Sequence, residues 1–372
     1  MTDSLDTIWP ISAHTEAKQK ILQAYLQAWF PILAFQSRVI RRTASPQIRF
    51  IDAFAGPGIY SGGEPGSPII ALESALGHVH DFPVPVEFIL IENDAERHSS
   101  LCTEIEKIRD RVSQTTSIIL DKPICDDCSV VLSGLLEKCA IEESNFGPAF
   151  VFLDQFGYAE IPIDLIGRIM GHTQCEVFIY FNWNNLGRFL GDPAKEGPVN
   201  RAFGSDVWKT VRCLKGNERA ARLRDIYKHA LRTKGHTANV LDFTMRGDNG
   251  EILNWLFFCT NHIRGIEEMK KAMEKVDITG SFQFCDKDDP NQFHLLSGYS
   301  IEQLANELST RLRGTVKSVD DVKAYVLTET PARLFKASLA LLYKQDRITV
   351  DSPPPDWRKG TFADGSMNIR FV

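Results

Sequence analysis

Several features are missing from this 372-residue sequence, and each absence argues against one class of protein. No apolar run is long enough to span a bilayer, so a membrane protein is not expected. The first residues, Met1–Ser4, lack the basic and apolar regions of a signal peptide, which favours a cytoplasmic location. An excess of positive charge is also missing. The formal net charge is −6, which argues against binding nucleic acid through overall charge.

Cysteines are few and scattered. Two of the eight, Cys175 and Cys259, lie in apolar runs, where a buried free thiol is the expected state. Cys125 and Cys128 have the spacing of a metal or redox pair, but no second pair follows to complete a zinc site. We therefore expect no metal, and a reducing, cytoplasmic environment.

A glycine turn directly after a short apolar run is the most informative stretch that is present. Ile48–Phe54 stops abruptly at Gly56-Pro57-Gly58, as a buried parallel strand does when it ends in a tight turn. The acid Asp52, the aromatic Phe54 and the glycines Gly56 and Gly58 resemble the first motif of Rossmann-like methyltransferases. There the turn holds the methionine end of S-adenosylmethionine. An ordinary strand-to-helix turn capped by Asp52 has the same residues.

Acids also follow the next two predicted strands. Val86–Ile91 ends at Glu92, and an acid at the second strand tip binds ribose hydroxyls in nucleoside-binding sheets. Glu92 lies 40 residues after Asp52, instead of about 20, because a glycine-rich loop precedes the first helix. Asp127, or its neighbour Asp126, is placed near the third strand to meet an adenine amine. The three strand tips together predict an S-adenosylmethionine site.

The fourth predicted strand ends in Asp154-Gln155-Phe156-Gly157. Methyltransferases that act on exocyclic amines have an acid or amide here, followed by proline and an aromatic residue. The acid accepts the N–H hydrogens of the amine, and the ring stacks on the base once it leaves its helix. We therefore predict Asp154, Gln155 and Phe156 as the catalytic residues. A helix cap at Asp154 and a core position for Phe156 are the structural alternatives.

Strand-like and helix-like stretches alternate through most of the chain, which predicts a Rossmann-like α/β fold. We expect an N-terminal helical segment (1–45), a methyltransferase domain of class I type (46–297) and a winged-helix-like domain (298–372). The last would consist of three helices and a hairpin. The seven mostly parallel strands are expected at Ile48–Phe54, Val86–Ile91, Ser117–Leu120, Ala149–Leu153, Glu176–Phe181, Asn239–Thr244 and Trp255–Thr260.

A helical insertion (183–237) separates the fifth and sixth predicted strands, because that connection is too long for an ordinary loop. Between Trp208 and Lys234 it carries nine Lys or Arg residues against Glu218 and Asp225. Such a local excess is typical of nucleic-acid binding, although a solvated helix face has the same composition. We predict nucleic-acid contacts from Arg219, Arg222 and Arg224, with Lys18 as a further candidate.

Several motifs resemble the three-Cys-motif partner family (TcmP), a group of Rossmann-type, methyltransferase-like proteins. The most specific are Phe50-Ile-Asp-Ala-Phe-Ala-Gly-Pro-Gly58 and Gly63-Glu-Pro-Gly-Ser-Pro68. His14-Thr15-x-x-Lys18, Leu90–Asn93, Phe152–Asp154 with Phe156-Gly157, and Gly360–Phe362 add to the resemblance, which extends over nearly the whole chain. It implies a radical-SAM-like partner that contains the three cysteines.

Gln155 departs from the Asp-Pro-Phe-Gly pattern of that family and of the guanine-N2 methyltransferases of tRNA. Two functions therefore follow from the sequence. The first is an S-adenosylmethionine-dependent methyltransferase acting on an exocyclic amine of a nucleobase, in RNA in preference to DNA. The second is a non-catalytic adaptor that keeps the fold and recruits a partner.

Overall fold

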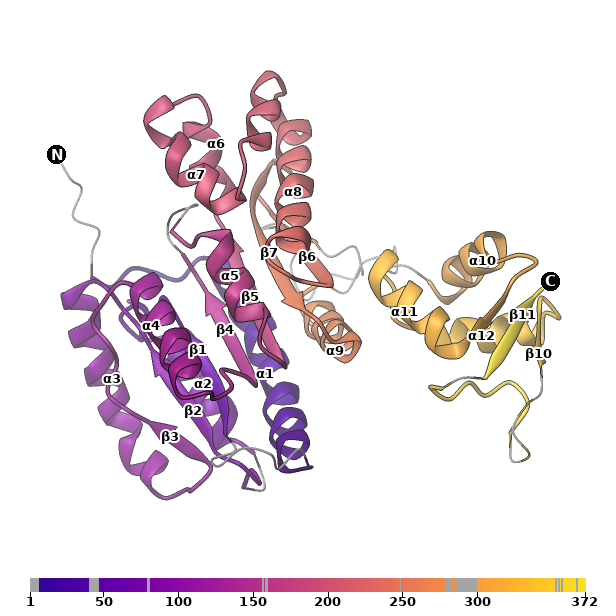
Figure 1. The fold of residues 1–372 in the computed structure, drawn as a ribbon, viewed down its shortest axis with the longest axis horizontal. Helices are drawn as coiled ribbons and strands as arrows, with labels where there is room; N and C mark the ends of the chain where they lie inside the picture. Colours follow the sequence, from indigo (N-terminus) through magenta and orange to yellow (C-terminus); the bar gives the residue numbers. More distant parts are fainter. Residues whose placement is uncertain are drawn as a thin grey trace. The chain divides into compact units, whose positions relative to one another are not determined.

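The fold is described from a computed structural model (Figure 1). It describes residues 7–39, 47–78, 81–155, 157, 160–247, 249–277, 283–285, 300–351, 353, 355, 357–365 and 367–372. These residues form two compact units. The first runs to Val276 and also includes Phe284; the second includes Asp277, Gln283 and the described residues from Ser300 onward. The N-terminal helix belongs to the first unit.

A mostly parallel sheet forms the centre of the first unit, in the order β3-β2-β1-β4-β5-β7-β6-β8. The first five strands in this order are parallel, and β7 is antiparallel to β5 and β6. The sequence predicted seven strands for this sheet; among the described residues the sheet has eight, because a short strand pairs beside β6. The strands are β1 Ile48–Asp52, β2 Val86–Leu90, β3 Ile118–Leu120, β4 Ala149–Leu153, β5 Cys175–Phe181, β6 Asn239–Arg246, β7 Ile252–Thr260 and β8 Gln283–Cys285.

One face of the sheet is aromatic and is covered by α1 (Ala13–Val39). Side chains alternate between the two faces of a strand, so Phe150 and Phe152 of β4 share a face with Phe50 of β1. Tyr25, Trp29 and Phe30 of α1 pack against this layer. On the same side, α1 contacts α2 (Ser67–Leu76) and α9 (Ile263–Glu274), and α3 (Ala95–Ser113) lies beside α2.

The opposite face is aliphatic and packs on α4 (Cys128–Ile141) and α5 (Ile163–Met170). The long connection between β5 and β6 is helical, as the sequence predicted, and it extends this core. It comprises α6 (Trp183–Phe189), η1 (Pro193–Lys195), α7 (Glu196–Phe203), η2 (Val207–Cys213) and α8 (Gly216–Thr233).

The second unit combines three helices with a three-stranded antiparallel sheet in the order β10-β11-β9. The expected hairpin is present, and capping boxes at Ser300 and Ser318 start the first two helices. The third helix begins at Phe335. The elements are α10 Ile301–Arg311, β9 Val316–Ser318, α11 Val319–Glu329, α12 Phe335–Lys344, β10 Ile348–Asp351 and β11 Asn368–Phe371.

Candidate functional site

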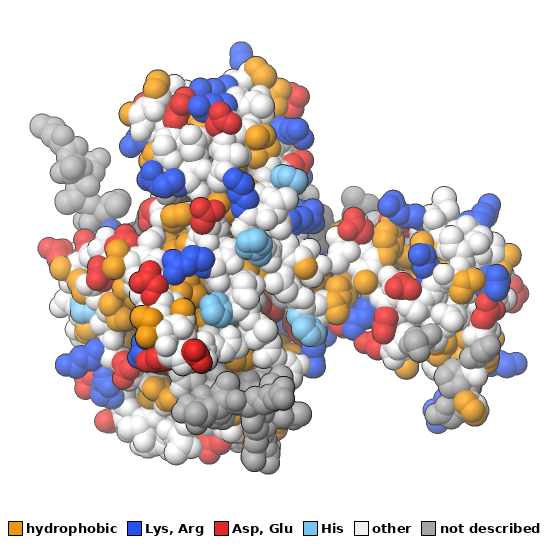
Figure 2. Space-filling view, in the orientation of Figure 1, with side chains coloured by type: hydrophobic (Ala, Val, Ile, Leu, Met, Phe, Trp, Pro, Cys, Tyr) orange, Lys and Arg blue, Asp and Glu red, His pale blue; other side chains and the backbone are white. Residues whose placement is uncertain are grey.

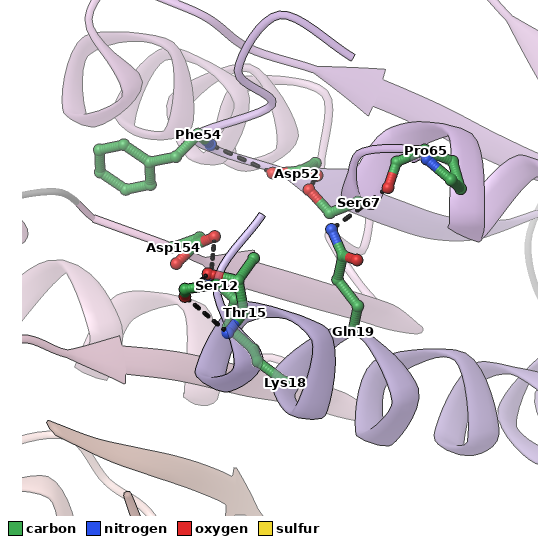
Figure 3. A network of polar contacts seen from close by, with 9 residues as sticks. All are labelled: Ser12, Thr15, Lys18, Gln19, Asp52, Phe54, Pro65, Ser67 and Asp154. Carbon is green, nitrogen blue, oxygen red and sulfur yellow. Dashed lines mark hydrogen bonds and ion pairs between the residues drawn. The ribbon is translucent and has the colours of Figure 1, made fainter. Parts of the chain in front are cut away.

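The candidate site lies where the strand order reverses, between β1 and β4. In open α/β sheets this switch point is where ligands bind, beyond the carboxyl ends of the strands. Asp52 ends β1 and Asp154 follows β4, and both lie on the face that α1 covers because they continue the alternation of Phe50 and Phe152. Tyr180 of β5 has the same orientation. Figure 3 shows the two acids and the α1 residues that approach them.

Lys18 of α1 forms an ion pair with Asp154 at this point. Its ammonium also lies 4.6 Å from the centre of the Tyr180 ring. Lys18 is only 5% exposed, so it does not fit the nucleic-acid contact predicted from the sequence. We assign it instead to positioning Asp154, since a buried ammonium fixes the carboxylate that it neutralises.

Asp52 is completely buried and organises the turn after β1. One carboxylate oxygen accepts a hydrogen bond from the Ser67 hydroxyl at 2.6 Å, and the other accepts the Phe54 N–H at 3.2 Å. Ser67, the first residue of α2, thus binds Asp52. Burial is the main reason why the pKa of Asp52 rises from 3.8 to about 7, with the Asp154 charge adding to it. Direct contact with a cofactor, as predicted for Asp52, does not fit this burial.

The raised pKa of Asp52 makes folding stability depend on pH. The folded state holds the Asp52 proton more tightly than the unfolded state. The free energy of unfolding of the wild type therefore falls as the pH rises from about 4, and this loss is complete above about pH 7. We expect the unfolding free energy of Asp52→Asn, relative to the wild type, to rise by roughly 2–4 kcal/mol between pH 4 and pH 8. Urea unfolding across this range measures the difference. Asp110→Asn, on the exposed side of α3, is the control, and a constant difference for Asp52→Asn would contradict the assignment.

Glu92 joins the ends of two neighbouring strands. Its Oε2 accepts the Gly56 N–H at 2.9 Å, and its Oε1 accepts the Asp94 N–H at 2.8 Å. Gly56 has φ of 62°, a conformation that favours glycine and turns its N–H toward the acid. Gly58, at φ of 81°, continues the turn. Glu92 is nearly buried, and each carboxylate oxygen keeps a second lone pair for a ligand.

A cavity of about 320 Å³ lies beside this turn and is rich in carboxylates. The predicted cofactor residues Glu92, Asp127 and Phe54 line it, and Phe54 and Ala53 contribute to its apolar wall. Asp127 caps α4 through Oδ1, which accepts N–H bonds from Ser129 and Val130. The complete lining is Ala53, Phe54, Glu92, Asn93, Asp94, Arg97, Asp126, Asp127, Cys128 and Glu160.

The cavity also contains residues that the sequence did not indicate. Glu160 is one; its pKa is raised by burial first, and also by the charges of Asp127 and Glu92. Arg97 is another, and its guanidinium lies 4.9 Å from the centre of the Trp9 ring. Neither residue belongs to a strand-tip pattern. Only the fold brings Glu160 and Arg97 into the lining of the cavity, and brings Trp9 of the N-terminal segment against Arg97.

Gln155 is 2% exposed, and its side-chain oxygen accepts the Glu160 N–H at 3.2 Å. The amide therefore binds the backbone of Glu160 within the protein, and its catalytic role stays a prediction. Phe156 lies outside the described residues.

The basic segment is largely neutralised within the protein. Arg224 and Lys228 pair with Asp242, and Arg219 donates to the backbone oxygens of Leu214 and Arg212. These contacts occupy the Arg219 and Arg224 guanidiniums within the protein, and the nucleic-acid contact of these residues stays a prediction. Figure 2 shows acidic side chains interleaved with the basic ones over α6–α8. Nine basic residues lie between Trp208 and Lys234, all in the described part of the chain. Those with no ion pair or hydrogen bond there are Lys215, Arg222 and Arg232, and all three are exposed.

Comparison with known proteins adds little to this geometry. No family model and no curated protein matches the chain. The fold resembles, at a TM-score of 0.26, the solved structure of a geranyl diphosphate methyltransferase in complex with GPP and sinefungin. The identity is 11%, over 62% of this chain and 77% of the other. At that level the functional assignment rests on the site alone.

Three further observations concern metal ligands, the Cys125–Cys128 pair and membrane helices. Among the described residues, no group of His, Cys, Asp and Glu is arranged to hold a metal ion. Burial raises the pKa of Cys128, the inner residue of the Cys125–Cys128 pair, to about 12, which leaves its thiol unreactive. None of the described helices has the length and apolar character needed to cross a membrane.

Proposed function

We propose that the protein binds S-adenosylmethionine in the acidic cavity and acts as a methyltransferase. The observation that carries this proposal is that Glu92 and Asp127, from the ends of neighbouring strands, line one cavity with Phe54. The chemistry of the cavity fits the cofactor. Carboxylates accept hydrogen bonds from ribose hydroxyls and an adenine amine, and their crowding near Glu160 favours a cationic ligand.

When bound, S-adenosylmethionine supplies a methyl group already activated by its sulfonium, so positioning provides much of the rate. In this proposal Glu92 holds the ribose and Asp127 or Asp126 the adenine amine. The N–H groups of the glycine turn approach the methionine end. Asp52 has an indirect part, because it fixes the turn and the start of α2.

We infer that the methyl acceptor lies against Asp154 and is an exocyclic amine of a nucleobase. Lys18 holds Oδ2 of Asp154, so Oδ1 is the atom assigned to accept an N–H of the target. The Asp154 carboxylate already has the Lys18 ammonium as its partner. Asp154 therefore orients the lone pair of the amine, and the proton leaves to water after the methyl group has transferred. Phe156 is assigned to stacking on the base.

RNA is the proposed source of that base, in preference to DNA. The exposed Arg222, with Lys215 and Arg232, provides phosphate contacts. We also propose that the second unit is a winged helix, since its elements follow the order helix, strand, two helices, two strands. A radical-SAM-like three-Cys-motif protein is the proposed protein partner, through the TcmP resemblance.

One observation favours the adaptor as a second candidate. Asp154 already has the buried Lys18 ammonium as its partner, so the negative charge of Asp154 is balanced without a substrate. A protein that has lost catalysis but keeps its fold would tolerate such a pair. In that case the cofactor cavity serves stability or partner binding, and no methyl group is transferred.

Cofactor binding tests the proposal directly. S-adenosylhomocysteine should bind with a dissociation constant in the micromolar range, about −8 kcal/mol, as measured by calorimetry. It should also raise the melting temperature, because a ligand that binds the folded state alone stabilises it. Adenosine and methionine, each carrying half of the contacts, are the controls and should bind more weakly. No heat and no thermal shift with S-adenosylhomocysteine would refute the methyltransferase assignment.

A further inference from the structure

A cavity of about 490 Å³ opens in the helical insertion, between α8 and the stretch that joins α7 to η2. Its volume is in the range typical of small-molecule sites, and it shares no residue with the proposed cofactor cavity. The residues that line it from α8 recur every three or four positions, so they occupy one face of that helix (Figure 1). The methyltransferase proposal uses only one of them, Arg222, and gives the cavity itself no role.

The floor of the cavity is apolar. It consists of the buried side chains of Phe203, at the end of α7, and of Ile226 and Ala230 on α8. All three belong to the core of the first unit. Val207 also lines the cavity and is 51% exposed. A surface of this kind favours a ligand with an apolar group, because covering it removes apolar area from water.

Three basic side chains line the same cavity. The side chains of Arg222 and His229 are exposed and have no ion pair or hydrogen bond within the described residues. Lys234 donates one hydrogen bond to the Gly204 carbonyl and retains two N–H groups for a ligand. Arg222 and Lys234 are 12 residues apart in the sequence, which corresponds to about 18 Å along a helix. The basic groups are therefore spread along the α8 wall of the cavity.

The acids next to these basic groups already have partners. Asp225, in the lining, accepts from the Arg224 guanidinium at 3.0 Å. Asp206, between two lining residues, lies 4.0 Å from the Lys209 ammonium. The cavity therefore keeps an excess of positive charge, which attracts an anion. Arginine and lysine side chains are the usual protein partners of phosphate groups.

We propose that this cavity binds a nucleotide, with the base against Val207 and the apolar floor and with phosphate on Arg222 and Lys234. A nucleotide joins a flat ring to an anion, which matches an apolar floor beside basic groups. A free mononucleotide and one nucleotide of an RNA strand share this chemistry. The spread of the basic groups along α8 exceeds the length of one nucleotide and favours the strand. In that form the proposal rests on the RNA substrate proposed above, and adds a contact away from the methylated base.

Saturation-transfer NMR on the full chain, with uridine monophosphate as the probe, tests this proposal. Uridine monophosphate lacks the adenine amine, so the cofactor cavity is not its expected site. It should bind with a dissociation constant of about 0.1–1 mM. Uridine and inorganic phosphate, each with half of the contacts, should bind more weakly. Saturating S-adenosylhomocysteine should not displace the probe, because the two cavities share no residue.

Two variants and their matched controls locate the binding site. Arg222→Gln should weaken binding of uridine monophosphate about fivefold. Arg201→Gln removes an exposed charge of the same insertion outside the cavity and should leave binding unchanged. Val207→Glu places a carboxylate on the apolar wall at an exposed position and should weaken binding about tenfold or more. Ile141→Glu makes the same change at an exposed position of α4 and should have no effect.

Fluorescence anisotropy with a labelled uridine pentanucleotide separates the two sources of the nucleotide. If the ligand is a strand, the pentanucleotide should bind at least about tenfold more tightly than the monophosphate at about 50 mM salt. Arg222→Gln should then reduce the slope of log affinity against log salt by about 0.7, the value for one phosphate contact on a single strand. Equal affinities of the two probes identify a free nucleotide as the ligand.

Three results overturn the proposal. One is no binding of either probe, with the monophosphate at about 10 mM. Another is equal weakening by Arg222→Gln and Arg201→Gln, which would mean that charge acts without the cavity. The third is tighter binding of a hexaglutamate peptide than of the pentanucleotide, which would favour an acidic protein partner. Binding of uridine monophosphate that depends on Arg222, in a protein that binds no S-adenosylhomocysteine, supports this site and refutes the methyltransferase proposal alone.

Discussion

Asp154→Ala should reduce the transfer of labelled methyl groups to total RNA by about a hundredfold or more. The dissociation constant of S-adenosylhomocysteine should change by no more than a few-fold. Asp154 is proposed to contact the methyl acceptor and not the donor, so its loss appears in the transition state and hardly in cofactor binding. Filter-bound radioactivity and calorimetry on the same preparations give the two quantities.

The ion pair with Lys18 determines which control is needed. Alanine at 154 leaves a buried ammonium without a partner, which costs about 3–5 kcal/mol of stability and would mimic a catalytic defect. Asp154→Asn retains an acceptor oxygen, and the double variant Lys18→Met with Asp154→Asn removes the orphaned charge. Both should remain folded by circular dichroism and keep part of the activity, because the amide oxygen still accepts an N–H of the target amine. Full transfer in a folded Asp154→Ala would place the chemistry at another strand tip, and no transfer by the wild type would favour the adaptor.

Glu92→Ala should weaken S-adenosylhomocysteine binding by roughly 1.5–3 kcal/mol, about tenfold to more than a hundredfold. Two effects contribute. The ribose hydroxyls lose a charged acceptor, and the glycine turn loses the bond from the Gly56 N–H. Calorimetry measures the sum.

An analogue of S-adenosylhomocysteine without the 2′-hydroxyl separates the two effects in a double-mutant cycle. If Glu92 binds the ribose, the analogue should lose affinity to the wild type and little further affinity to Glu92→Ala. Ser100→Ala is the matched control, because its hydroxyl supports the same turn through the Pro57 carbonyl at 3.0 Å. Equal losses in Glu92→Ala and Ser100→Ala would mean that Glu92 acts only on the loop.

The sheet and its acidic strand tips were predictable because they depend on local patterns. Apolar runs of strand length located the seven predicted strands, and parallel strands bring their carboxyl ends to one edge. The sequence therefore predicts that Glu92 and Asp127 lie near each other, and in the structure both line one cavity. The eighth strand has only three residues, too few to show a pattern.

Partners supplied by distant elements were not predictable. Lys18 precedes Asp154 by 136 residues, and only the docking of α1 on the sheet brings them together. The basic segment shows the same limit: its charge excess is visible in the sequence, but Asp242 and Glu196, which neutralise much of it, belong to other elements. A count of charges along a chain does not reveal which of them are already paired.

The contact between α9 and Glu176, a buried acid of β5, has an evolutionary consequence. A Cβ at Gly265 would lie 2.3 Å from Oε1 of Glu176, which two hydroxyls hold in place. The Thr260 hydroxyl lies 2.8 Å from the same Cβ position, so a side chain at 265 requires a shorter residue at 176 and a shift of Thr260, whereas a long acid at 176 favours glycine at 265. In an alignment of descendants of this chain, the two columns should change together, although 89 positions separate them in the sequence.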